Sequence, residues 1–417
     1  MVRKGSTQQS SAPYNRRIVL DIIRRRGAMS RKAIVEKVGL SPQTVANITQ
    51  DLETIGLIVS RRDKSEKSRG QPPIAFDLNP QGGDAIGISL EPRRASAALV
   101  NLIGEVIDRR EVEIDVADQT RTLAAMKRLV EDLTRSSLSG GRLWGIGVAM
   151  PGPFDATELS FVGPTAFEGW QDLSILDDLH RVTGLPVFYS VDSVAGALGE
   201  SLFGVAKALD GFFYMHFGVG LGGTLVVDRA AYKGANSNAT EIGHIPIVPG
   251  GRPCYCGNNG CLERYLSLHS LAETLGAPDA HALSATRIIE LLERKDPVVI
   301  NWCRNAAEHL RNAICIIENM LDPESIVIGG SAPKPLVEHI LMAARPFHRS
   351  VRGGIADDSR RVLLSERQDD SSILGAAVLP IYKMLSPRFD VLLQDGKSEL
   401  ELAGMLGHKP TGGAGRL

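Results

Sequence analysis

A cluster of cysteines near the middle of the chain places the strongest constraint on its fold. Three of the five cysteines lie within eight residues, and a histidine stands ten positions before the first of them; the four side chains are His244, Cys254, Cys256 and Cys261. A Cys3His set fills all four positions of tetrahedral zinc, which is typical of a structural site rather than a water-activating one. The alternative is a group of buried thiols, which pack as small apolar side chains. Because the segment is rich in Gly and Asn, and Glu241 and Glu263 flank it, we predict a zinc site beside a ligand pocket.

The length and composition indicate a globular protein with more than one domain. A chain of 417 residues is expected to form two or three domains. Its apolar content of 43% and charged content of 23% are ordinary for such proteins, and no apolar run approaches the ~20 residues that a membrane span needs. The N-terminus lacks the apolar core of a signal peptide. We therefore expect a cytoplasmic protein with no membrane partner.

The charges are divided unevenly along the chain. Residues 1–80 contain 15 Lys and Arg against 7 Asp and Glu, whereas the remainder contains 32 against 41. One end is therefore basic and the rest acidic, although the net charge is only −1. Such a division favours a nucleic-acid-binding segment attached to a body with another role.

Three short helices are predicted in the basic segment. The apolar residues between Tyr14 and Arg26 fall on one helical stripe, and Gly27 provides a stop. Ser30 is a suitable N-cap for a second helix, and Ser41 followed by Pro42 begins a third that runs to about Ile55. The third helix turns short uncharged side chains outward, namely Gln43, Thr44, Asn47 and Gln50. Side chains of this kind read base edges in a major groove of double-stranded DNA.

Two short apolar runs follow and predict a β-hairpin with a basic tip. Its cations would contact DNA phosphates or enter the minor groove; they are Arg61, Arg62, Lys64, Lys67 and Arg69. Three helices and a basic hairpin together predict a winged helix-turn-helix. The alternative is a small helical protein-binding module, which the arginine-rich wing disfavours.

The body is predicted to be an α/β structure of two lobes. After residue 83 the pattern indicates three successive strands, a helix over residues 120–138, a buried strand at 144–150, a helix and a strand at 186–191. This βββαβα order is that of the actin-like, ribonuclease-H-like fold, in which two lobes clasp a ligand. We expect a winged helix over 14–80, a first lobe over 81–195 completed by a helix at 372–385, a second lobe with the zinc motif over 196–371, and a mobile tail over 387–417.

With these motifs in place, the chain resembles the ROK family of repressors and sugar kinases. The resemblance covers about residues 14–385 and is greatest to the repressors of the xylose and N-acetylglucosamine type, which carry an N-terminal winged helix. Its markers include residues 145–153, residues 218–223, Glu241-Ile-Gly-His244 and the run from Cys254 to Glu263. The cysteine run is highly specific, whereas any one glycine element alone would be weak.

The resemblance implies roles for individual residues. The zinc ligands would be His244, Cys254, Cys256 and Cys261, and the residues facing a sugar would be Gly152, Asp192, Glu241, His244 and Glu263. Asp192 would occupy the position of the kinase catalytic base. Carboxylates suit a polyol, because each can accept hydrogen bonds from two vicinal hydroxyl groups, and in a kinase one would deprotonate the attacking hydroxyl. The alternative is that Asp192 and Glu241 are ordinary turn or capping carboxylates.

The sequence departs from the kinase pattern at two places. Family kinases begin the first lobe with Asp-x-Gly-Gly-Thr, whose backbone amides hold ATP phosphates. Here residues 89–93 read Ser-Leu-Glu-Pro-Arg, and Pro92 has no N–H to donate. The Asn that precedes the catalytic Asp in the family is Val191. We therefore expect no kinase activity.

The function predicted from these features is transcriptional regulation. We expect a DNA-binding repressor of carbohydrate genes, controlled by a sugar bound between the lobes, with zinc as cofactor and a homodimer or tetramer as the working form. One alternative is an ATP-dependent sugar kinase with an appended DNA-binding head. Another is a regulator controlled by a protein partner instead of a sugar. The sequence leaves the effector sugar, the operator and the sign of regulation open.

Overall fold

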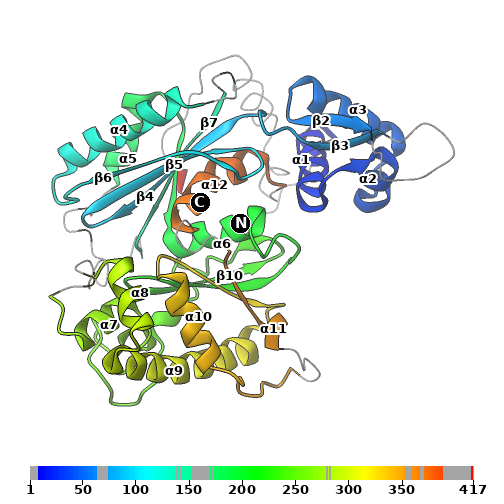
Figure 1. Ribbon diagram of the computed structural model, residues 1–417. Helices are drawn as coiled ribbons and strands as arrows, with labels where there is room; N and C mark the ends of the chain where they lie inside the picture. Colours follow the sequence, from blue (N-terminus) through cyan, green and yellow to red (C-terminus); the bar gives the residue numbers. More distant parts are fainter. Residues whose placement is uncertain are drawn as a thin grey trace.

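A small N-terminal domain projects from a two-lobed body in the computed structural model (Figure 1). The structure describes residues 8–62, 74–137, 140, 142–152, 167, 170, 173–278, 280, 283–352, 358–366, 371–387 and 415–416. The N-terminal domain, called the head below, comprises the elements up to residue 78. Within the described residues no helix is long and apolar enough to cross a membrane.

The head contains the three predicted helices. They are α1 (Gln8–Arg26), α2 (Arg31–Val38) and α3 (Pro42–Thr54). The N-caps are those expected from the sequence: Ser30 accepts a hydrogen bond from the Ala33 amide at 3.3 Å, and Ser41 accepts one from the Thr44 amide at 3.1 Å. These bonds satisfy amides that have no partner inside the helix. The first helix begins earlier than predicted, because it includes the polar residues from Gln8 to Pro13.

A three-stranded sheet completes the head. Its strands are β1 (Met29–Ser30), β2 (Ile58–Arg62) and β3 (Ile74–Leu78), in the order β1-β3-β2. The antiparallel pair β2 and β3 forms the predicted wing, with Ile58 opposite Leu78. Arg61 and Arg62 are exposed at its end, whereas Lys64, Lys67 and Arg69 lie outside the described residues. The winged helix-turn-helix prediction is confirmed.

The first lobe is a six-stranded sheet with helices on both faces. Its strand order is β14-β8-β7-β4-β5-β6. The strands are β4 (Asp84–Glu91), β5 (Arg94–Asn101), β6 (Val106–Glu113), β7 (Leu143–Met150), β8 (Val187–Val191) and β14 (Gly415–Arg416). Helices α4 (Gln119–Arg135) and α5 (Ser174–Thr183) cover one face, on which Ile86, Ile88 and Val148 are buried. Helices α6 (Asp192–Phe203) and α12 (Ser371–Leu385) lie on the other face, toward the second lobe (Figure 1).

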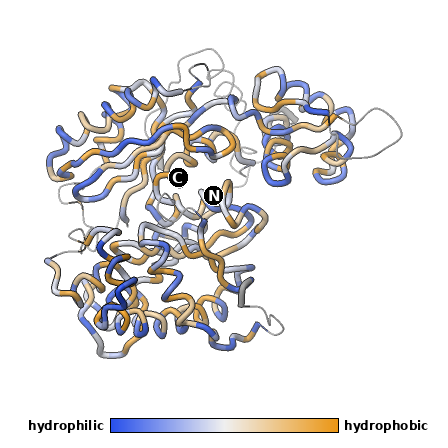
Figure 2. Tube along the Cα trace, viewed as in Figure 1, coloured by the Kyte–Doolittle hydropathy of each residue, from blue (hydrophilic) through white to orange (hydrophobic). Residues whose placement is uncertain are grey.

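The second lobe is a five-stranded sheet backed by long helices. Its strand order is β11-β10-β9-β12-β13. The strands are β9 (Phe212–Phe217), β10 (Leu221–Val227), β11 (Ala230–Ala231), β12 (Ile326–Gly329) and β13 (Val362–Leu364). The helices are α7 (Leu268–Thr274), α8 (Ala285–Glu293), α9 (Pro297–Leu321), α10 (Lys334–Ala343) and α11 (Asp358–Arg361). Figure 2 shows the apolar residues concentrated along the strands and the inward sides of these helices.

The observed order confirms the predicted actin-like architecture and adds elements that the sequence did not reveal. The strand and helix pattern from 84 to 191 is as expected, whereas α10 and β13 were not predicted. The predicted tail, 387–417, lies almost entirely outside the described residues. At its end, however, β14 pairs in parallel with Phe188 and Tyr189 of β8.

Helix α12 packs against the first sheet at unusually close range because glycines face it. An added Cβ at Gly87 would lie 2.3 Å from the Ile373 carbonyl oxygen, and one at Gly147 would lie 1.8 Å from that of Ala376. No side chain therefore fits between the helix and strands β4 and β7. The other side of α12 packs equally closely on α6, where a Cβ at Gly375 would lie 2.5 Å from the Ala195 carbonyl carbon.

Substitution of Gly147 by Ala should consequently destabilise the first lobe. The methyl group would force α12 away from β7, and overpacking of this kind costs about 1–3 kcal/mol. Urea unfolding of the full chain should show a lower midpoint. The matched control is Gly211→Ala, whose added Cβ would be 3.4 Å from its nearest neighbour, Val226 O. Equal stability of the two variants would contradict the packing argument.

Candidate metal centre and ligand pocket

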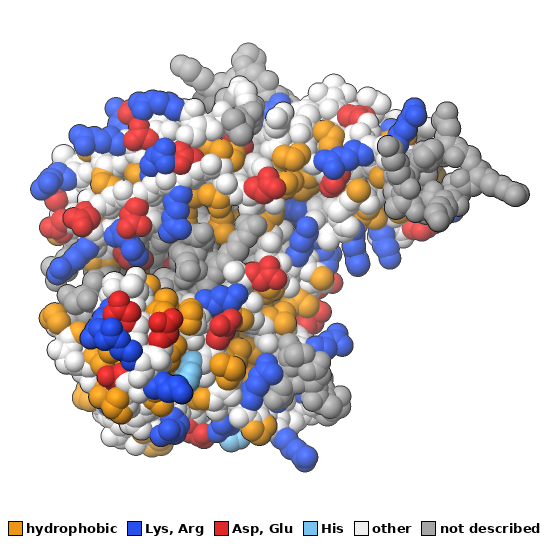
Figure 3. Space-filling model, viewed as in Figure 1, with side chains coloured by type: hydrophobic (Ala, Val, Ile, Leu, Met, Phe, Trp, Pro, Cys, Tyr) orange, Lys and Arg blue, Asp and Glu red, His pale blue; other side chains and the backbone are white. Residues whose placement is uncertain are grey.

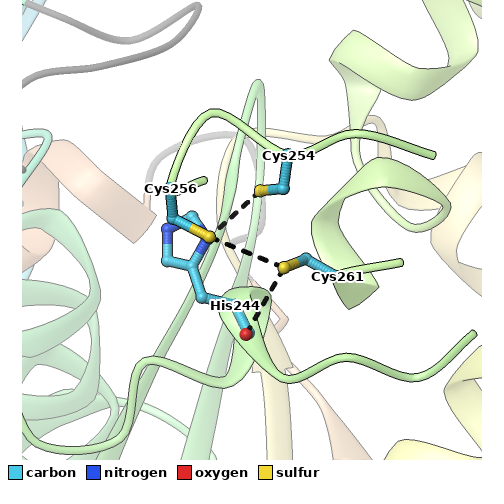
Figure 4. Close-up of side chains that lie close together, drawn as sticks. All are labelled: His244, Cys254, Cys256 and Cys261. Atoms are coloured by element: carbon cyan, nitrogen blue, oxygen red, sulfur yellow. Dashed lines mark hydrogen bonds between the residues drawn. The ribbon is translucent and has the colours of Figure 1, made fainter. Parts of the chain in front are cut away.

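The four predicted zinc ligands converge in the second lobe. One donor atom from each of His244, Cys254, Cys256 and Cys261 can be chosen so that all lie within 4.8 Å of one another. Figure 4 shows the three sulfur atoms turned toward one another beside the imidazole ring. The Cys254 sulfur lies 3.5 Å from His244 Nδ1, and the sulfurs of Cys256 and Cys261 are 3.6 Å apart. The cluster is the only such group among the described residues.

The donor set fits a tetrahedral metal ion. Zinc binds thiolate at about 2.3 Å, so two sulfur ligands of one tetrahedron are about 3.8 Å apart. The two sulfurs of Cys256 and Cys261, 3.6 Å apart, are close to this value. The 3.5 Å between Cys254 Sγ and His244 Nδ1 matches the spacing of a thiolate and an imidazole ligand, which is about 3.5 Å because zinc binds nitrogen at about 2.0 Å. Burial raises the pKa of the Cys254 and Cys261 thiols, so a metal ion would have to displace their protons as it binds. Three sulfurs and one imidazole leave no open position on such an ion.

Tight turns position the three cysteines. The Cys254 amide donates to Asn258 O at 2.8 Å, and the Gly257 amide donates to Cys254 O at 3.1 Å. Gly257 and Gly260 have φ of 90° and 79°, a left-handed conformation that favours glycine. A Cβ at Gly260 would also lie only 1.7 Å from Val248 O. The Gly and Asn content noted in the sequence therefore serves the turns of this loop.

Polar contacts join the cysteine loop to α7. Tyr255, between two of the cysteines, accepts a hydrogen bond from Arg264 Nη1 at 3.0 Å and contacts His269 Nε2 through its hydroxyl. Arg264 also forms an ion pair with Glu273, in which Nη2 lies 2.7 and 2.9 Å from the two carboxylate oxygens. The loop is thus tied to α7 through the contact between Tyr255 and His269.

Three carboxylates come together beside the metal site. Glu241 directly precedes the 3-10 turn Ile242–His244, and Glu263 lies in the turn Leu262–Arg264. Glu263 accepts a hydrogen bond from the Leu221 amide at 2.8 Å. Burial raises the pKa of Glu241 to about 7, and the nearby charges of Asp192 and Glu263 act in the same direction. The structure therefore brings residues of the predicted pocket together from positions 192, 241 and 263.

Asp192 reaches this group from the opposite lobe. It is the first residue of α6, where its Oδ1 accepts a hydrogen bond from the Ser193 amide at 2.6 Å. Its other oxygen is 3.6 Å from Nε2 of His216, a residue of β9. The carboxylate thus contacts the backbone at the start of α6 with one oxygen and faces the second lobe with the other. The N-cap of α6 is Val191, and no side chain caps the helix, so the capping role considered from the sequence is not observed for Asp192.

An open pocket is lined by Glu241, one of the three carboxylates. One wall is the end of β8 with the start of α6, and the other is β11 and the following loop up to Glu241. Its polar lining residues are Ser190, Ser193, Tyr232, Lys233, Ser237, Thr240 and Glu241. The pocket therefore lies between elements of the two sheets and offers hydroxyl, ammonium and carboxyl groups.

His216 is a site residue that the sequence analysis missed. It is buried, with 5% of its surface exposed, and its Nδ1 has no hydrogen-bond partner among the described residues. A buried polar atom of this kind is normally satisfied by a ligand or water. The available signal was a single polar residue in the otherwise apolar strand Phe-Phe-Tyr-Met-His-Phe.

The remaining predicted residues lie elsewhere. Gly152 follows β7 and is half-buried; no described contact joins it to the carboxylates. Gln43, Asn47 and Gln50 are exposed on α3 of the head, as predicted, whereas Thr44 is half-buried and its hydroxyl lies 2.8 Å from that of Ser41. Residues 89–93 form the end of β4 and its tight turn into β5, with Glu91 paired to Arg94.

Family comparisons agree with this architecture. The ROK family model matches residues 85–382, and the MarR family model matches residues 16–67. The first match covers the two-lobed body, and the second covers most of the head, without β3.

Individual relatives include both regulators and a kinase. The xylose repressor of Caldicellulosiruptor bescii is 27% identical over 391 residues, which cover 89% of this chain and 96% of that protein. The glucokinase of Halalkalibacterium halodurans is 30% identical over 288 residues, 63% of this chain and 86% of that protein. A crystal structure of a ROK family transcriptional regulator, described as a homologue of the E. coli Mlc protein, is 26% identical, with a TM-score of 0.69 over 95% of this chain and 99% of that one. The chain therefore belongs to the ROK family.

Proposed function

We propose that the protein is a transcriptional repressor of carbohydrate genes whose two-lobed body binds a sugar. The observation that carries this proposal is the combination, in one chain, of a winged helix with an exposed polar recognition face and a pocket between two lobes that is lined by Glu241, the neighbour of Asp192 and Glu263. The likeness to a ROK transcriptional regulator extends over 95% of the chain, head included. The named relatives that match most of the chain include xylose repressors.

In this proposal α3 enters the major groove of double-stranded operator DNA. Gln43 donates to Asn47 through its side-chain amide at 2.9 Å, so the two amides form one polar surface that can pair with base edges. Arg61, Arg62 and Arg69 of the wing contact phosphate. A homodimer or tetramer would place two such heads on half-sites separated by about one helical turn.

The effector would be a sugar held by Asp192, Glu241, Glu263 and Gly152. A carboxylate accepts hydrogen bonds from adjacent hydroxyl groups, and these side chains come from both lobes. His216 could satisfy its buried Nδ1 with a further hydroxyl group. Binding would therefore draw the lobes together.

Zinc would be held by His244, Cys254, Cys256 and Cys261 and would supply structure, because its four positions are filled. Nδ1 of His244 lies among the sulfurs, which leaves Nε2 to donate a hydrogen bond to the ligand. The metal would in this way fix the ring between the two glutamates.

The geometry at the first lobe supports binding without catalysis. In a phosphate-binding loop of this fold, free backbone N–H groups hold the phosphates. Here Pro92 has none, and Arg94 lies against Glu91 with Nη2 3.0 Å from the carboxylate. Asp192 would then bind a hydroxyl group instead of deprotonating it for transfer. The kinase remains the rival function, and ATP turnover on the same sugars tests it.

The DNA-binding assignment predicts two different effects of substitution. Asn47→Ala should weaken binding to the preferred duplex by about tenfold or more, because a lost base contact costs about 1–3 kcal/mol, and should leave non-specific binding unchanged. Arg61→Ala should weaken binding to all duplexes. It should also reduce the slope of the logarithm of the binding constant against the logarithm of salt concentration by about one. Titrations at several salt concentrations measure both. Lys127→Ala on α4 of the body is the control, and equal loss in all three variants would argue against the assignment.

The sugar site predicts a ligand-dependent rise in thermal stability. A sugar at 100 times its dissociation constant stabilises the folded protein by about 2.7 kcal/mol. A thermal-shift screen against D-xylose, D-glucose and N-acetylglucosamine should find such a ligand, and Glu241→Gln should abolish the shift. Glu131→Gln on the exposed face of α4 is the matched control. A shift that survives in Glu241→Gln would exclude this pocket, and ATP-dependent phosphorylation of the sugar would favour the kinase.

Zinc is predicted to support both stability and sugar binding. The purified protein should contain about one zinc ion per chain, and Cys256→Ser should remove it and lower the thermal midpoint by several degrees. The same variant should bind the sugar more weakly, because His244 loses its fixed orientation. Cys315→Ser, outside the cluster, is the control. A zinc-free protein with normal sugar affinity would refute the coupling of metal and ligand.

A further inference from the structure

The head is attached to the first lobe through the end of its recognition helix. Arg142, just before β7, donates from Nη1 to Ile55 O at 2.8 Å and to Gly82 O at 3.2 Å. Ile55 is the C-cap of α3. Apolar residues of the head and of the first lobe, among them Leu57, Leu102 and Trp144, also belong to one continuous core. The orientation of α3 is therefore set by the first lobe.

The head also contacts the second lobe, through α1. Arg25 Nη2 lies 2.8 Å from Asp210 Oδ1, and Arg229 Nε lies 3.8 Å from Asp21 Oδ2. Asp210 precedes β9, and Arg229 lies in the turn between β10 and β11. Figure 3 shows Lys and Arg side chains on the side of the head that turns toward the second lobe. A domain held by both lobes must shift, or lose contacts, when the lobes move relative to each other.

Arg229 is held in place by three backbone carbonyl groups, one of which belongs to α6 of the first lobe. Its guanidinium donates to the carbonyl oxygens of Lys207, Leu209 and Ser201 at 3.3, 3.0 and 3.1 Å. Its amide donates to Asp210 O at 2.9 Å. Asp210 and Arg229 therefore move as one unit with the β10–β11 turn.

The same turn leads directly into the ligand pocket. Ala231, Tyr232 and Lys233, which follow Arg229 by two to four positions, line the pocket. The Tyr232 amide donates to Leu225 O at 2.8 Å, so this short hairpin is hydrogen-bonded from its turn to the pocket wall. A displacement of the wall by a ligand is thereby carried to the residues that hold α1.

We propose that the ion pairs Arg25–Asp210 and Asp21–Arg229 transmit the state of the pocket to the head, with the β10–β11 hairpin as the connecting element. This inference rests on the proposed function and assigns the residues that couple its two sites. The Arg25–Asp210 pair is partly exposed, at 17% and 65% of the side-chain surfaces, so its contribution to stability is small. Its importance lies in joining α1 to the wall of the pocket.

Coupling of this kind is reciprocal, so DNA bound to the head should alter the pocket. The probe is a duplex that the full-length protein selects from a random-sequence library. Hydrogen exchange of the peptide spanning residues 228–241 is measured with and without this duplex. In the unmodified protein, exchange should change by about fivefold or more on DNA binding, since coupling factors are typically about 5–150-fold.

Asp210→Asn should reduce that change to about twofold or less, while DNA binding remains. The double variant Asp21→Asn with Asp210→Asn should abolish it. The matched control is Asp228→Asn, an equal loss of charge in the same exposed turn at a residue with no ion pair among those described. Asn also tolerates the φ of 49° found there.

The outcomes separate this inference from the proposed function. If no duplex is enriched, the protein is not a sequence-selective DNA-binding regulator, and the inference falls with that function. If DNA binds but the exchange of residues 228–241 is unchanged, only the inference is overturned. It is also overturned if Asp210→Asn transmits the change as fully as Asp228→Asn does.

Discussion

The close packing of α12 against the first sheet is the contact on which the arrangement of the two lobes depends. Glycines at 87 and 147 remove the side chains that would keep this helix at an ordinary distance. The same helix packs on α6, which begins with Asp192. Its first residue, Ser371, accepts a hydrogen bond from the Gly330 amide at 2.9 Å and donates to the Gly330 carbonyl at 3.0 Å. One helix is therefore bonded to the second lobe at its start and buried against the first along its length.

The candidate site follows from this arrangement. Glu241 and Glu263 are fixed by short turns that carry or adjoin the candidate metal-binding residues His244 and Cys261, whereas Asp192 is fixed by α6. The distance between Asp192 and the two glutamates is therefore set by the separation of the lobes, and the hydrogen-bonded cysteine loop supports the glutamate side of the site. Burial of Glu241 beside two other carboxylates is unfavourable while they are charged and unpaired, and the hydroxyl groups of a polyol would relieve it. Binding of a polyol would therefore lower the free energy of such a site.

Sequence patterns predicted those parts of the molecule that depend on local chemistry. The caps Ser30 and Ser41, the stripe of α3, the strands of the first lobe and the Cys3His cluster all depend on residues close together in the chain. Helix α10 was missed because Pro333 and Pro335 suggest a loop, although proline is well tolerated in the first turn of a helix, where its missing N–H has no partner to lose. His216 was missed because its strand is otherwise apolar. The pairs Arg25–Asp210 and Asp21–Arg229 join residues more than 180 positions apart, and no local pattern indicates which of many surface charges will meet.

A kinase and a repressor of this fold would both use closure of the two lobes, but for different purposes. A kinase closes its lobes to bring a phosphate to a hydroxyl group, and free amides at the first β-turn hold that phosphate. In this chain the turn carries Pro92 and an arginine paired to Glu91, while the carboxylates from both lobes remain. Closure of the lobes would then still depend on a bound sugar, but no phosphate transfer would follow it. The head is anchored to the first lobe through Ile55 and to the second lobe through Asp21 and Arg25. A change in the separation of the lobes would therefore move the head or break one set of these contacts.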